Sequence, residues 1–98
     1  MMINRRIYYL SPGKFNDALS IMKEIKELTK QHFNKDLKIL TAIYGPFNTI
    51  VIELEYENAK EQEEFSKQWY PLLFEKALVD KYFDVVQSDT NELWQDNR

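Results

Sequence analysis

Four side chains of this sequence are the best candidates for holding a small ligand: Arg6, Tyr8, Glu53 and Trp94. Arg6 and Tyr8 are two residues apart, so in an extended strand they lie on the same face. Burying a carboxylate is costly unless a cation pairs with it, and Arg6 is a suitable partner for Glu53. Such a pocket would bind a small polar or anionic organic ligand, or place a general base beside an orienting cation. The alternative is a structural salt bridge at a solvated rim of a sheet.

The remaining residues narrow the possible chemistry. The sequence contains one histidine, His32, and no cysteine. His32 falls among polar residues at the end of a predicted helix, where a solvated capping role suits it. One histidine without cysteine leaves no transition-metal set within a chain, while carboxylate-bound Mg²⁺ or Ca²⁺ stays open. We assign no catalytic residue, no metal ligand and no cofactor; for an enzyme, cofactor-free acid–base or oxygenation chemistry is the remaining route.

Composition is typical of a small globular domain. The chain has 98 residues, 44% of them hydrophobic and 30% charged, with only 2 glycines and 3 prolines. Its formal net charge of −3 argues against nucleic acid as a partner, because phosphate backbones attract basic surfaces. No apolar stretch is long enough for a signal peptide or a membrane span. We expect a cytoplasmic protein with no membrane partner.

The hydrophobic pattern predicts a β-α-β-β-α-β order, with strands over 3–10, 37–44, 49–57 and 90–95 and helices over 15–32 and 59–87. Pro71 is expected to kink or restart the second helix, and Ser88-Asp89 to end it. A set of aromatic side chains on this second helix is interpreted as core: Phe65, Trp69, Phe74, Tyr82 and Phe83.

This order predicts a ferredoxin-like α+β fold over residues 1–98, with a four-stranded antiparallel sheet and both helices on one face. The other face must be solvated or covered by a second chain, and apolar residues on both sides of the first two strands favour a homodimer. The first and third strands are neighbours in this fold. Arg6 and Glu53 should therefore meet on the face away from the helices, with Tyr8 within reach, although a register slip of one residue would put Arg5 in place of Arg6.

Two motifs extend this prediction to a family. RIYYLSPGK at residues 6–14 is similar to a pattern Arg-x-Tyr-x-Leu-x-Pro-Gly-Lys, and GPFNTIV at 45–51, followed by EYE at 55–57, is similar to a hairpin Gly-Pro-Leu-Asn-Thr-Val-Val with Glu-Tyr-Glu. Both patterns belong to the NIPSNAP-like family of the dimeric α/β-barrel superfamily, which the chain resembles. Members of that family often carry His or Trp on the third strand, where Ile52 and Leu54 stand here.

The resemblance implies a homodimer whose two sheets pair into a barrel, with a cavity between each sheet and its partner. The wider superfamily includes cofactor-independent monooxygenases, haem-degrading enzymes and members without assigned activity, and fold alone does not choose among them. We predict a NIPSNAP-like protein that binds a small polar or anionic organic ligand in the barrel. The alternatives are a cofactor-independent monooxygenase-type enzyme and a structural or protein-interaction module without a ligand.

Overall fold

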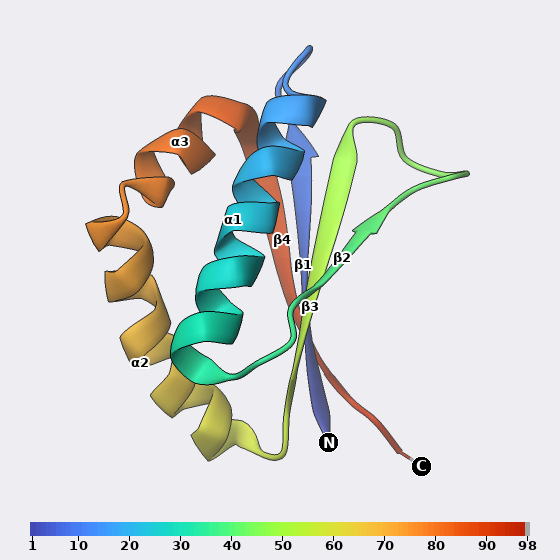
Figure 1. Ribbon diagram of the computed structural model, residues 1–98. Helices are drawn as coiled ribbons and strands as arrows, with labels where there is room; N and C mark the ends of the chain where they lie inside the picture. Colours follow the sequence, from blue (N-terminus) through green and yellow to red (C-terminus); the bar gives the residue numbers. More distant parts are fainter. Residues whose placement is uncertain (98) are drawn as a thin grey trace.

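The computed structural model describes residues 1–97 and places their strands and helices in the order β-α-β-β-α-α-β (Figure 1). The elements are β1 (Met2–Leu10), α1 (Phe15–Phe33), β2 (Lys38–Thr41), β3 (Thr49–Tyr56), α2 (Ala59–Glu75), α3 (Leu78–Val85) and β4 (Val86–Gln95). The strands form one antiparallel sheet in the order β2-β3-β1-β4, and the helices cover one of its faces. This arrangement confirms the predicted ferredoxin-like α+β fold. None of the helices within residues 1–97 has the length and apolar character that a membrane span requires.

Alternation along β3 decides which face the helices cover. Ile50, Ile52 and Leu54 are buried, with at most 1% of each residue exposed, and they pack into the core with side chains of α1 and α2. Val51 and Glu53 have the opposite parity and point to the face that the helices leave open. Cross-strand pairing then assigns a face to every residue of β1, because directly opposed residues lie on the same side of a sheet.

The second helical region differs from the prediction in where it breaks. α2 continues through Pro71 and ends at Glu75. The break comes at Ala77, whose φ of 58° is left-handed, and α3 begins directly after it. Packing of Trp69 and Leu73 on either side of Pro71 holds α2 together despite the missing N–H.

The last strand is longer than predicted and the second is shorter. Ser88 and Asp89 do not end a helix; they pair with Tyr9 and Tyr8 of β1, so β4 begins at Val86. Backbone pairing with β1 outweighs the turn preference of Ser-Asp. β2 ends at Thr41, and a long connection follows it.

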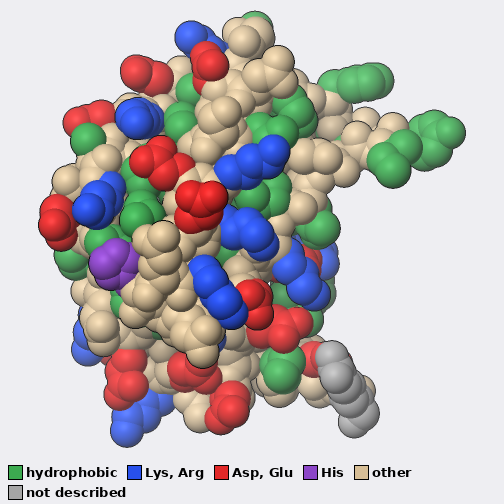
Figure 2. Space-filling model, in the orientation of Figure 1, with side chains coloured by type: hydrophobic (Ala, Val, Ile, Leu, Met, Phe, Trp, Pro, Cys, Tyr) green, Lys and Arg blue, Asp and Glu red, His purple; other side chains and the backbone are tan. Residues whose placement is uncertain are grey.

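This β2–β3 connection projects from the body of the molecule and carries exposed apolar side chains (Figure 2). Ile43, Tyr44 and Phe47 are 93%, 95% and 97% exposed. Asn48 anchors the connection, because its Nδ2 donates to the carbonyl oxygens of Leu10 at 2.8 Å and Ser11 at 3.2 Å. The hairpin is thus tied to the end of β1.

Gly45 gives a test of this hairpin. Its φ is +119°, a conformation that side chains with a Cβ rarely adopt, while a Cβ added there would meet no atom within 4 Å. Gly45→Val should therefore lower the free energy of unfolding by about 1–3 kcal/mol through backbone strain alone. Urea denaturation measures the change. Ala42→Val, which adds bulk to the same connection at an exposed position, is the control, and equal midpoints for the two variants would contradict the prediction.

Candidate functional site

The structure divides the four candidate residues between the two faces of the sheet. In the β1–β3 register Arg5 lies opposite Glu53, whereas Arg6 lies opposite Ile52. The prediction that Arg6 and Glu53 meet on the open face is therefore wrong. Arg6 and Tyr8 point toward the helices, because Tyr8 shares its face with the buried Ile50.

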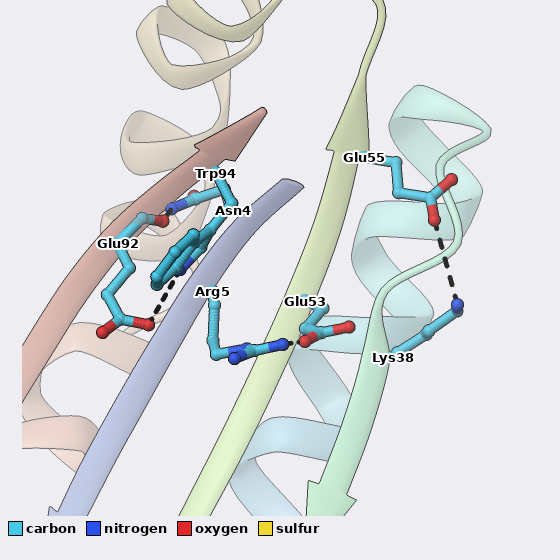
Figure 3. Close-up of polar contacts among 7 residues, drawn as sticks. All are labelled: Asn4, Arg5, Lys38, Glu53, Glu55, Glu92 and Trp94. Atoms are coloured by element: carbon cyan, nitrogen blue, oxygen red, sulfur yellow. Dashed lines mark hydrogen bonds and ion pairs between the residues drawn. The ribbon is translucent and has the colours of Figure 1, made fainter. Parts of the chain in front are cut away.

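On the open face, Glu53 is paired with Arg5. Arg5 Nε donates to Glu53 Oε2 at 2.7 Å, and this pair is the structural salt bridge considered as the alternative (Figure 3). Lys38 and Glu92 flank it in register, so charges of alternating sign cross the sheet. Trp94 lies on the same face, where its Nε1 donates to Glu92 Oε1 at 3.1 Å. Glu53 and Trp94 thus lie on the side of the sheet away from Arg6 and Tyr8.

On the helix side, Arg6 and Tyr8 line a cavity of about 320 Å³ between the sheet and the three helices. Its floor is polar and comes from β1 and β4: Arg6, Tyr8, Asp89, Thr90 and Asn91. Its walls are mostly apolar and aromatic side chains of the helices: Met22, Ile25, Trp69, Tyr70, Leu73, Phe74, Leu78, Val79, Tyr82 and Phe83. A cavity of this size accepts a small organic molecule.

Within residues 1–97, Arg6 has no carboxylate partner in the cavity. Its guanidinium carbon lies 4.9 Å from the ring centre of Trp69 and 5.3 Å from that of Tyr70, within the range of cation–π attraction. Its Nε donates to Asn4 Oδ1 at 3.2 Å. Across residues 1–97, the ion pairs of the structure do not include Arg6. A permanent positive charge therefore faces a mostly apolar space.

Tyr8 and Tyr82 supply hydroxyl groups beside this charge. Burial raises the pKa of Tyr8 to about 12, and the Arg6 guanidinium opposes part of that rise. Burial and the hydrogen bond that the Tyr82 hydroxyl donates to the Asp89 carboxylate raise the pKa of Tyr82. The two rings meet edge to face with centres 5.5 Å apart. Both hydroxyls are protonated at neutral pH, and Tyr82 orients Asp89 at the cavity floor.

Solved structures with this architecture identify the fold. One is a NIPSNAP family protein of unknown function from Agrobacterium tumefaciens, with 19% identity, a TM-score of 0.84, and coverage of 100% of this chain and 89% of that chain. Another is an uncharacterized NIPSNAP domain protein from Burkholderia xenovorans, with 14% identity, a TM-score of 0.83, and coverage of 99% and 95%. This chain shares the fold of these two NIPSNAP proteins. The resemblance predicted from the two motifs is confirmed at the level of fold.

The same fold also occurs in proteins of other description. A putative antibiotic biosynthesis monooxygenase from Nitrosomonas europaea has 12% identity and a TM-score of 0.74, with 98% of both chains covered. No family sequence model matches the chain, and no curated protein matches its sequence. These comparisons establish the fold of the chain and do not establish a shared active site.

The sequence alone did not predict several residues of the cavity. Phe74 and Phe83 were interpreted as core, but they are 66% and 71% exposed and lie at the cavity. Asp89 and Asn91 were assigned to a break and a strand without a role. The two-residue spacing of Asp89 and Asn91 puts both side chains on one face of a strand. This spacing indicates a shared site only if the strand begins before Asp89, as β4 does at Val86.

Proposed function

We propose that this protein binds a small organic anion with an aromatic or other apolar body in the cavity between its sheet and helices. The observation that carries the proposal is the Arg6 guanidinium, which lines a mostly apolar cavity and forms no ion pair with residues 1–97. A partly buried charge that faces an apolar space is costly unless an opposite charge satisfies it. An anionic group on the ligand would supply that partner.

The polar floor and the mostly apolar walls of the cavity indicate how such a ligand would lie. Its anionic group would contact Arg6 on the floor, and its apolar body would pack against aromatic side chains such as Trp69 and Tyr70. A hydroxyl or amide on the ligand could bond Asp89 or Asn91. A neutral molecule of the same shape would keep the packing and lose the charge interaction.

Two adjacent arginines provide a matched test. Naphthoate serves as the anionic probe and naphthamide as its neutral counterpart, with binding measured by calorimetry. Arg6→Ala should weaken naphthoate binding by about tenfold to a hundredfold, because hydrogen bonds to a charged group are lost. Arg5→Ala should bind naphthoate as the unaltered protein does, because Arg5 points to the other face and pairs with Glu53.

Two results would contradict the proposal. One is an unaltered protein that binds naphthoate no better than naphthamide. The other is an equal loss of naphthoate binding in Arg6→Ala and Arg5→Ala. Thermal unfolding of both variants separates a lost binding contact from a lost fold.

An enzyme of the cofactor-independent monooxygenase type is the second candidate. The observation that favours it is the Tyr82–Asp89 contact, which places an oriented carboxylate on the cavity floor. Among the described residues that line the cavity, Asp89 is the one acidic side chain, so it is the group that would accept a proton from a bound hydroxyaromatic molecule. Dioxygen uptake in the presence of such a molecule would favour the enzyme, and binding without uptake would favour the binding protein.

We further propose that two copies of the chain pair through their open sheet faces. Leu40, Val51 and Ile7 lie side by side across β2, β3 and β1 and form an apolar row on that face. The neighbouring row contains two cations and two anions, so a second copy would meet no net charge there: Lys38, Glu53, Arg5 and Glu92. A small domain gains much from covering such a surface.

A further inference from the structure

Asn4 is a buried amide whose hydrogen bonds join two strands and Arg6. It is 3% exposed, and its Nδ2 donates to Asn91 Oδ1 at 2.6 Å and to the Glu92 carbonyl oxygen at 2.8 Å. Its Oδ1 accepts from Arg6 Nε at 3.2 Å. Exchanging the amide oxygen and nitrogen would place donor against donor at Arg6 and acceptor against acceptor at Glu92. The orientation of Asn4 is therefore determined by its partners.

We propose that Asn4 is a positioning residue that sets the Arg6 guanidinium for two-point recognition of a carboxylate. This inference rests on the proposed function, since it concerns how the same cavity recognises its anion. The bond to Asn4 uses the Nε–H of Arg6 and leaves its two terminal nitrogens, with four N–H groups, to interact with the hydroxyls of Tyr8 and Tyr70 and with a ligand. Those donors form the planar fork that matches the two oxygens of a carboxylate.

The aromatic rings restrict the guanidinium further. Trp69 and Tyr70, both on α2, contact it through their ring systems, while Asn4 holds its Nε from β1. An arginine side chain that is free loses much rotational freedom when it binds an anion. An arginine already restrained from a strand and a helix loses less, so the carboxylate is bound more tightly.

Comparison with Arg5 explains why an amide is suited to this position. The Nε of Arg5 is also occupied, but by the carboxylate of Glu53, which neutralises the charge. The Nε of Arg6 is occupied by a neutral amide oxygen, which orients the guanidinium and leaves its positive charge available. The Nε–H of each arginine is thus hydrogen-bonded, in Arg5 to a carboxylate and in Arg6 to an amide. Arg5 is a structural cation, and Arg6 is an anion receptor.

Two substitutions of Asn4 test this role with naphthoate and naphthamide as probes. Asn4→Leu has similar size and removes the acceptor for Arg6 Nε, and it should lower naphthoate affinity about tenfold while changing naphthamide affinity less than about twofold. Asn4→Asp keeps an acceptor at the same place but adds a negative charge beside Arg6. It should weaken naphthoate binding at least as much, because the introduced carboxylate competes with the ligand.

The ratio of naphthoate to naphthamide affinity separates positioning from a purely structural role. If Asn4 only joins β1 to β4, Asn4→Leu loses stability while its folded form keeps the preference for the anion, which would overturn the inference. In that case the difference between Arg6→Ala and Arg5→Ala still supports the proposed function. Absence of any preference in the unaltered protein would overturn both.

A measurement on the unaltered protein covers the case in which the Asn4 variants do not fold. The Nε–H proton of Arg6 should exchange slowly with solvent in nuclear magnetic resonance spectra, because Asn4 Oδ1 accepts it in a buried site. Naphthoate should shift the resonances of the terminal nitrogens of Arg6 and leave those of Arg5 in place. Rapid exchange at Arg6 Nε, or equal shifts at both arginines, would overturn the inference.

Discussion

Trp69→Ala should lower the free energy of unfolding by about 3–5 kcal/mol, a large part of the stability of a domain this small. Trp69 is 2% exposed, and its Nε1 donates to Thr29 Oγ1 at 2.9 Å. Its ring stacks on Phe65 with centres 5.4 Å apart and also lies beneath Arg6. Truncation removes this packing and leaves an enlarged cavity between the sheet and α2, and urea denaturation measures the loss.

A surface position on the same helix is the control for Trp69. Lys67 is exposed and its ion pair with Glu63 spans 3.5 Å at the surface, so Lys67→Ala should change stability by less than about 0.5 kcal/mol. If Trp69→Ala lowered the free energy of unfolding no more than Lys67→Ala, the indole of Trp69 would not be part of the core, and the prediction would be contradicted. Calorimetry with naphthoate on the folded variant would then show whether the cavity keeps its ligand.

Val51→Asp should separate the two copies of the chain that we propose to pair through their open sheet faces. Val51 lies between Leu40 and Ile7 in the apolar row of the open face, and it is only partly buried in one chain. A charge introduced at the centre of a face that a second copy covers is costly to desolvate, so association is lost. Sedimentation at micromolar concentration should give about twice the 11.8 kDa chain mass for the unaltered protein and about the chain mass for the variant.

The control places the same new charge on the other side of the molecule. Ser20 is exposed on α1, so Ser20→Asp should leave the sedimenting mass at two chains. A single-chain mass for the unaltered protein would remove the dimer proposal. Circular dichroism of Val51→Asp confirms that a fall in mass reflects dissociation of folded chains.

Where the sequence has one strict period, local physics was sufficient to predict the structure. Along β3 the apolar residues occupy every second position, so Ile50, Ile52 and Leu54 could pack on one face only. The stripe on α1 has the helical period, and Gly45 has a positive φ that glycine adopts readily. These patterns also explain why the order of strands could be predicted, whereas the resemblance to NIPSNAP proteins came from the two motifs at residues 6–14 and 45–57.

β1 carries no such strict pattern, and there the prediction failed. Arg5 and Arg6 are chemically equivalent neighbours, as are Tyr8 and Tyr9, so a shift of one residue exchanges the two faces without any local penalty. Contacts between residues distant in the sequence decide which face of β1 turns toward the helices. Tyr8 packs against Tyr82 of α3, and Arg6 lies over Trp69 of α2. The face of β1 therefore depends on helices that begin some fifty residues or more later in the chain.

The cavity depends on long-range structure for the same reason. Its floor comes from the two ends of the chain, where Arg6 lies opposite Asn91 and Tyr8 lies opposite Asp89. None of these residues has a neighbour in sequence that marks it as part of a site. A cluster of this kind arises only when β4 pairs with β1, because the energy that assembles it is backbone pairing and helix packing rather than any local preference.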